Sequence, residues 1–262
     1  MTRLLFTTAF LVLIAGCAHS PPPTATTPLT TTTPLVSDIT VSDDKVSLFS
    51  TNEIGGIPQG WEPLIIHKTK KRTEYTLVAD HGQTVMHARA ASASSGLMQK
   101  VSINPVVRPW ISWDWKIDSL IATANNADRD AEDSPARIIL GFDGDKDTLP
   151  FTDQILFETA RVVTGHDFPY ATLMYVWENK APVGSIIASS RSGRIKMLVA
   201  ASGPAGVGEW KNFTRNFVED YEKAFGEKPG KLIGVGILSD TDNTGETVEA
   251  WYGDITLQNS GD

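Results

Sequence analysis

Residues 111–117 read Ile-Ser-Trp-Asp-Trp-Lys-Ile, and this stretch decides the fold class. Every second position is apolar, and the positions between them are Ser, Asp and Lys. A period of two is the spacing at which side chains point to the same face of a β-strand. The stretch therefore predicts a strand that buries one face. It also predicts that Trp113 and Trp115 are core residues rather than a platform for a ligand.

Similar alternation recurs between residues 137 and 257, where Gly-, Pro- and Asp-containing turn sequences separate the runs. Many strands with few helices predict a mainly β fold, a single jelly-roll or β-sandwich domain with one or two short helices. The apolar positions of these runs are Ile138, Leu140 and Phe142; Leu173, Tyr175 and Trp177; Ile195, Met197 and Val199; Ile233, Val235 and Ile237; and Trp251, Ile255 and Leu257.

One segment, from Phe217 to Phe225, has helical spacing instead. Asn216 can cap its N-terminus, and Glu219 three residues later makes a variant of the capping box. Gly226 can end the helix, and Pro229 prevents its continuation. We expect this helix to pack across one end or edge of the sandwich.

The N-terminus carries the pattern of a lipoprotein signal peptide. An apolar run, Leu4–Ala15, is too short to span a bilayer as a helix but suits the apolar region of a signal. It closes on Ile14-Ala15-Gly16-Cys17, which resembles the bacterial lipobox, and Cys17 is the only cysteine in the chain. We expect residues 1–16 to be removed and Cys17 to carry acyl chains that anchor the protein to a membrane. The alternative is an ordinary secretory signal with a chance cysteine.

Residues 17–45 are predicted to form the acylated cysteine and a linker. Of the 16 residues Ser20–Leu35, 12 are Pro or Thr and none is charged, so this stretch suits a semi-rigid spacer rather than a packed core. Residues 46–258 then make the globular domain. By resemblance to lipoprotein sorting in Gram-negative bacteria, Ala18 favours the outer membrane, and we expect its periplasmic face.

Composition excludes several function classes. The chain has 262 residues, with 31 Asp plus Glu against 23 Lys plus Arg, and its net charge of −8 argues against a nucleic-acid partner. One cysteine excludes an internal disulfide and a cysteine-based metal cluster, and the five histidines show no metal-ligand spacing. Neither a G-x-S-x-G nucleophile elbow nor a glycine-rich phosphate loop is present.

An acidic cluster precedes the strand that begins at Arg137. Asp128, Asp130, Glu132 and Asp133 are either a solvated loop or a set of carboxylates that binds a hard cation or performs acid–base chemistry. Arg137 lies on the strand face opposite the apolar positions, where a guanidinium needs a carboxylate from the protein or from a ligand. We therefore place Arg137 and Asp133 among the candidate ligand-binding residues.

The segment Asp240-Thr-Asp-Asn-Thr-Gly245 resembles the first half of a calcium loop but has Trp251 at the twelfth position, so it is no EF-hand. Asp240 and Asp242 are candidate ligands of a structural cation, with calcium as the candidate ion, or members of an Asx-turn network. No other cofactor is predicted.

Two further candidates concern the helix start and the tryptophans. Arg215 and Asp220 flank the predicted helix N-terminus, where Arg215 binds an anion or pairs with Asp220. Trp177 lies near a strand end and is a candidate for stacking on a sugar ring, as are Trp61, Trp210 and Trp251.

Five motifs appear in the chain in a fixed order: Trp113–Lys116, Glu132–Arg137, Arg215–Pro229, Asp240–Thr244 and Trp251-Tyr252. Together they resemble a family of bacterial envelope proteins defined only as a domain of unknown function. The resemblance covers roughly Val46 to Leu257 and implies a galactose-binding-like or lectin-like jelly roll without an established activity. The insertion Phe151–Phe168 departs from the family pattern.

Two functions remain open. The first is a non-catalytic, lipid-anchored envelope protein that binds a saccharide beside Arg137 and Arg215. Because the chain is acidic and repels polyanions, we expect neutral or sparsely charged sugars rather than sulfated ones. The second is a polysaccharide-degrading enzyme, a lyase or a glycoside hydrolase, on the same scaffold. Two carboxyl groups roughly 5–5.5 or 6.5–9.5 Å apart across a cleft favour a hydrolase. A Tyr or His beside an Arg favours a lyase.

Overall fold

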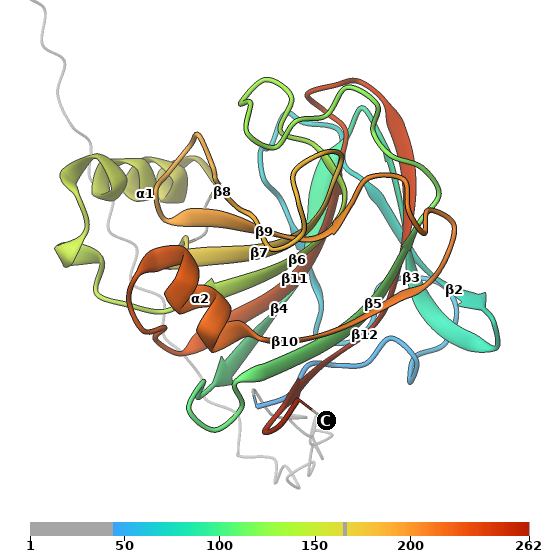
Figure 1. Cartoon of the computed structure of the whole chain (residues 1–262), viewed down its shortest axis with the longest axis horizontal. Coiled ribbons are helices and arrows are strands. Elements are labelled where there is room, and N and C mark those ends of the chain that lie inside the picture. Colours follow the sequence, from blue (N-terminus) through green and yellow to red (C-terminus); the bar gives the residue numbers. More distant parts are fainter. Residues whose placement is uncertain (1–43, 165–166, 262) are drawn as a thin grey trace, which may run out of the picture. The chain divides into compact units, whose positions relative to one another are not determined.

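The computed structural model describes residues 44–164 and 167–261. The predicted signal peptide, Cys17 and nearly all of the linker lie outside these residues. Within them, twelve strands form two sheets that pack face to face, which confirms the mainly β sandwich (Figure 1). No helix in this part of the chain is long and apolar enough to cross a membrane.

Neighbouring strands are antiparallel except β7 and β9, which run parallel. The larger sheet has the order β1 (Glu62–Leu64), β4 (Ser94–Ile103), β11 (Leu232–Asp240), β6 (Ser134–Phe142), β7 (Ala171–Glu178), β9 (Ile195–Ser202), β8 (Ile186–Ala188). The smaller sheet has the order β10 (Lys211–Asn216), β5 (Trp110–Ile117), β12 (Thr247–Gln258), β3 (Gln83–Ala91), β2 (Glu74–Asp80).

The core between the sheets is aromatic. Trp113 and Trp115 of β5 are 1% and 0% exposed, so the prediction that they are core residues is confirmed. The ring of Trp113 stacks on Tyr175 of β7 with centroids 4.7 Å apart, an offset arrangement that joins the two sheets.

A bulge in β12 changes which of its side chains face the core. Tyr252 pairs with Trp115 and Ile255 pairs with Trp113, so β12 has one residue more than β5 over this interval. Trp251 therefore lies on the outer face of the smaller sheet, while Ile255 is buried. The expectation that Trp251 and Ile255 share a face is wrong, because the extra residue reverses the alternation.

The predicted helix is α2 (Phe217–Phe225), and its caps are confirmed. The Asn216 side chain accepts hydrogen bonds from the backbone N–H groups of Val218 and Glu219, and Gly226 ends the helix with a φ of 73°. Tyr221 is fully buried against Phe142, with ring centroids 4.7 Å apart. The helix packs on β5, β9 and β10 and covers one side of the sandwich (Figure 1).

The insertion between β6 and β7 contains a short 3-10 helix, η1 (Lys146–Thr148), and a second helix, α1 (Phe151–Thr164). α1 lies beside the β8 edge of the larger sheet (Figure 1). Phe157 is its buried anchor, and its ring stacks on Phe168 with centroids 6.4 Å apart. The pattern of the sequence did not single out this helix, because several of its apolar side chains face solvent.

Candidate functional site

Arg137 is the centre of a buried polar network at the start of β6. Its side chain is 4% exposed, and Nη2 lies 3.2 Å from Oδ1 of Asp240 on the neighbouring strand β11. Nη2 also donates to Oδ1 of Asn126 and to the carbonyl oxygen of Glu132, both at 3.1 Å. The protein itself therefore supplies the carboxylate that Arg137 was expected to need. That carboxylate is Asp240, and not Asp133.

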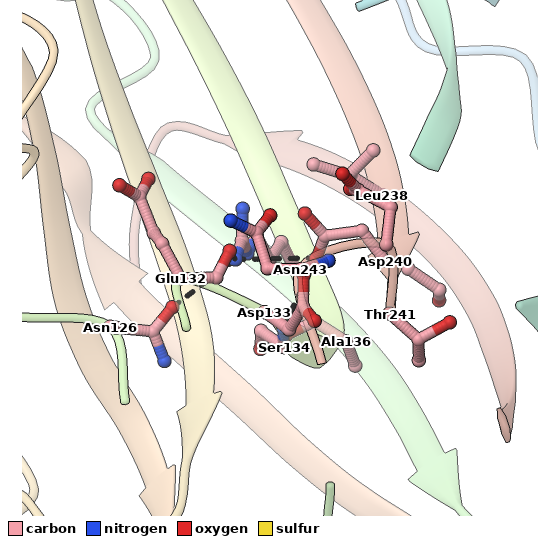
Figure 2. A network of polar contacts seen from close by, with 12 residues as sticks. Asn126, Glu132, Asp133, Ser134, Ala136, Leu238, Asp240, Thr241 and Asn243 are labelled. Carbon is pink, nitrogen blue, oxygen red and sulfur yellow. Dashed lines mark hydrogen bonds and ion pairs between the residues drawn. The ribbon is translucent and has the colours of Figure 1, made fainter. Parts of the chain in front are cut away.

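Asp133 is fully buried and supports the turn that follows β11. Its carboxylate accepts the backbone N–H of Thr244 at 2.7 Å and that of Asn243 at 3.4 Å. Figure 2 shows Asp133, Asp240 and Asn243 close together where β6 begins and β11 ends. The predicted acidic cluster is thus divided, because Glu132 and Asp133 are buried whereas Asp128 and Asp130 are exposed.

The two residues predicted to hold a cation already have cationic partners. Asp242 forms an ion pair with Lys70, and Asp240 pairs with Arg137. One carboxylate oxygen from each of Asp133, Asp240 and Asp242 lies within 4.8 Å of the others. Burial raises the pKa of Asp240 to about 7, and the carboxylates of Asp133 and Asp242 act in the same direction, against Arg137.

Arg215 and Asp220 join β10 to α2 and lie apart from that network. Arg215 Nε donates to Oδ2 of Asp220 at 2.8 Å, and the hydroxyl of Tyr175 donates to the same oxygen at 2.9 Å. The hydrogen bond to Asp220 raises the pKa of Arg215. The guanidinium therefore has a buried protein partner, and Arg215 shares no partner with Arg137 among the described residues.

The ring of Trp177 is fully buried, and its Nε1 donates to the carbonyl oxygen of Gly203 at 3.1 Å. Trp61 is 5% exposed. Neither ring offers an open face to a sugar in this structure.

Trp251 and Trp210 are half-buried on the outer face of the smaller sheet. Trp251 lies between His87 of β3 and Lys116 of β5, its partners on the two neighbouring strands. The His87 ring stacks on it at 5.0 Å, and Lys116 Nζ lies 4.4 Å from its centroid. Nε1 of Trp210 donates to Asp80 at 2.8 Å. His87 and Lys116 cover the Trp251 ring, so these contacts stabilise the surface of the sheet and leave little of the ring free to stack on a sugar.

An open hollow of about 460 Å³ lies between the first turns of α1 and the turn that follows β8. The Ser192 hydroxyl donates to Oδ1 of Asp153 at 2.9 Å across this hollow. Behind it, Ser189 Oγ lies 3.4 Å from both carboxylate oxygens of the buried Glu132. The lining residues are Pro150, Thr152, Asp153, Leu156, Ser189, Ser190, Arg191, Ser192 and Gly193.

The candidate residues predicted from sequence do not line this hollow. Glu132, a member of the predicted acidic cluster, reaches it only through Ser189. The sequence of the serine-rich turn after β8 predicts a loop and contains no catalytic or binding motif. The other side of the hollow is formed by α1, the helix that the sequence pattern did not reveal.

A family model described as "Protein of unknown function (DUF3047)" matches residues 59–256. No curated protein is significantly similar to the chain in sequence.

Among solved structures, the chain is similar to a variant of the family 29 carbohydrate-binding module CBM29-2 complexed with mannohexaose, with 10% identity, 83% of this chain and 92% of that chain covered, and a TM-score of 0.35. It is similar to the non-crystalline cellulose-specific module CBM28, with 13% identity, 84% and 96% covered, and a TM-score of 0.34. It is also similar to a variant of the ENZbleach xylanase, with 10% identity, 83% and 88% covered, and a TM-score of 0.38. At these scores the similarities carry no argument about function.

Proposed function

Since the chain belongs to the DUF3047 family, whose description assigns no activity, we propose from its own residues that it is a non-catalytic saccharide-binding protein. The proposal includes an acylated Cys17 that holds it at the periplasmic face of the bacterial outer membrane. The single observation that carries saccharide binding is the hollow between α1 and the turn after β8.

The lining of the hollow suits a sugar because it mixes hydrogen-bonding and apolar groups. A sugar ring presents several hydroxyl groups that need donors and acceptors, and C–H faces that need apolar contact. Hydroxyls such as those of Thr152 and Ser190 act in both roles, and Leu156 and Pro150 supply apolar surface. The volume of about 460 Å³ falls in the range of roughly 300–1,000 Å³ that is typical of small-ligand sites.

The carboxylates support binding rather than hydrolysis. Hydrolysis of a glycosidic bond needs two carboxyl groups that both reach the scissile bond. Among the described residues that line the hollow, Asp153 is the only carboxylate, and it accepts a hydrogen bond from Ser192. It is therefore placed to receive a sugar hydroxyl through its remaining acceptor sites.

A glycoside hydrolase is the second candidate, and one observation favours it. Asp153 and the buried Glu132 each contact a serine of the same turn, Ser192 and Ser189. Movement of Ser189 would give Glu132 access to the hollow and complete a pair of carboxyl groups. A lyase has less support, because neither Tyr nor His is among the described residues that line the hollow.

The experiment is a polysaccharide-binding screen with the full chain purified in detergent, repeated with Thr152→Val and Asp153→Asn. Glu158→Gln is the matched control, because Glu158 lies on α1 outside this hollow. We expect the two hollow variants to lose binding at an unchanged melting temperature, and the control to bind normally. Binding that survives both hollow variants would contradict the proposed site. Release of sugar products that stops in both Asp153→Asn and Glu132→Gln would establish the hydrolase instead.

A further inference from the structure

α1 presents an apolar face to solvent. Phe151 is 74% exposed, Ile155 is 49% exposed and Val162 is 76% exposed. At 100° per residue these three side chains lie within about 40° of one another around the helix axis. They are three of the ten large apolar side chains that are exposed in the described residues. Such clustering on one helix face marks an interaction surface.

The opposite side of α1 is already used for folding. Phe157 packs on Phe168, and Asp153 accepts a hydrogen bond from Ser192. The exposed face therefore needs a partner from outside the described domain.

We infer that this face of α1 lies in the interfacial layer of the lipid bilayer that holds the acylated Cys17. The inference rests on the lipid anchor in the proposed function. Residues 18–43 separate Cys17 from the first described residue, and these 26 residues reach at most about 90 Å even when fully extended. The anchor thus keeps the domain close to a bilayer, where a weak apolar contact is favoured by its high effective concentration.

The size and charge of the face fit a bilayer better than a second copy of the chain. Three side chains supply far less than the roughly 800 Å² per partner of a standard protein interface. Glu158 lies on this face between Ile155 and Val162. Arg161 at its flank pairs with Glu158, Nη2 to Oε2 at 2.9 Å, and with Asp167, Nε to Oδ1 at 3.8 Å. The face therefore carries no excess positive charge and suits zwitterionic headgroups.

The saccharide hollow remains open in this orientation. Thr152 and Leu156, which line it, lie about 100–140° around the helix from Phe151. The apolar face would rest on the bilayer while the hollow opens beside it. The contact thereby orients the domain, whereas the acyl chains supply most of its membrane affinity.

The test uses the fact that Cys17 is the only cysteine, so that an introduced cysteine is the single free thiol of the acylated chain. Ile155→Cys and the control Val106→Cys each receive an environment-sensitive NBD label. Val106 is 86% exposed and lies in the loop between β4 and β5. The full acylated chain is reconstituted into phosphatidylcholine vesicles.

We expect the label at position 155 to shift to the blue and to be quenched by nitroxide-labelled lipid, and the label at position 106 to do neither. Equal spectra at both positions, in a chain that floats with the vesicles, would overturn the inference and leave the anchor intact. A chain that does not float would overturn the anchor and the inference together. A blue shift at position 155 without vesicles, accompanied by a doubled mass in solution, would assign the face to a second copy.

Discussion

Arg137 and Asp240 form an ion pair between β6 and β11, with Nη2 and Oδ1 3.2 Å apart and side chains only 4% and 7% exposed. The pair lies at the end of the larger sheet where the acidic segment enters β6 and the Asp240 turn leaves β11. Asn126 and the Glu132 carbonyl also accept hydrogen bonds from Arg137, and the Ser134 N–H donates to Asp240, while Nε of Arg137 has no hydrogen-bond partner among the described residues. The contact thus holds two loops and two strands in one arrangement.

Removal of one partner should destabilise the protein strongly. At pH 8, where Asp240 is ionised, Asp240→Ala leaves the Arg137 guanidinium buried without its counter-ion, which typically costs about 3–5 kcal/mol. We expect the free energy of unfolding in urea to fall by this amount. The double variant Arg137→Met/Asp240→Leu should recover much of the loss, because no unpaired charge remains.

The matched control is the exposed pair Arg161–Glu158 of α1. Glu158→Gln should leave the free energy of unfolding nearly unchanged, because solvent screens exposed pairs. Equal effects at Asp240 and Glu158 would contradict a structural role for the buried pair.

Stability should fall as the pH rises from about 4 to about 7. Burial raises the pKa of Asp240 from its ordinary value of 3.8 to about 7, so the folded state alone holds this proton over that interval. Between these two pKa values the free energy of unfolding falls by about 1.4 kcal/mol per pH unit for a single group, and above pH 7 it no longer changes. Below the ordinary value both states are protonated and the contribution is fully present.

Asp240→Asn should flatten this slope, which urea unfolding at a series of pH values would measure. Asp80→Asn is the control, because the hydrogen bond from Lys116 lowers the pKa of Asp80 and its contribution is lost only as the pH falls. A slope between pH 4 and 7 that survives in Asp240→Asn would show that another group titrates there.

Arg215→Ala tests whether Arg215 serves a ligand or the fold. Asp220 is 8% exposed in its side chain, and without Arg215 only neutral donors such as Tyr175 remain beside it. We expect a loss of a few kcal/mol in stability because a buried carboxylate loses its counter-charge. Saccharide affinity per folded molecule should be unchanged. Weaker binding at unchanged stability would instead support the ligand role expected from the sequence.

Six strands and α2 could be predicted because each is encoded within a few residues; these strands are β5, β6, β7, β9, β11 and β12. The alternation in residues 111–117 and the Asn216 and Gly226 caps need no distant partner. The β12 bulge could not be predicted in this way. Its one extra residue reverses which side chains of β12 face the core, and no residue type in the sequence indicates it. α1 could not be predicted from a buried apolar face, because the face that carries Phe151 and Val162 is exposed in the domain.

The candidate site was less predictable because its contacts are long-range. The sequence indicates that Arg137 needs a carboxylate, but only the adjacency of β6 and β11 selects Asp240. Trp177 was expected to stack on a sugar because it lies near a strand end, but the structure places it in the core with Leu173 and Tyr175, with which it alternates. The hollow joins α1 to a serine-rich turn, and no local pattern brings these segments together.

Calcium should not stabilise the Asp240 turn. Lys70 and Arg137 already neutralise Asp242 and Asp240, and backbone N–H groups occupy Asp133. A cation bound only to the folded state would raise the melting temperature by mass action. We therefore expect identical melting midpoints with calcium and with EDTA at pH 8, where Asp240 is ionised. A calcium-dependent rise that disappears in Asp242→Asn would restore the cation site predicted from the sequence.

Cys17→Ser should release the protein from the membrane. If Cys17 carries the proposed lipid, the serine cannot accept it through a thioether, and the acyl chains that would provide stable anchoring are lost. The apolar face of α1 remains, but three exposed side chains without an anchor bind a bilayer only weakly and reversibly. We expect the variant to leave the outer-membrane fraction of the cell, while Val162→Ser, which alters α1 and leaves the lipobox intact, should stay with it. Retention of Cys17→Ser in the outer membrane would show that the prediction of acylation at Cys17 is wrong and that another element holds the protein there.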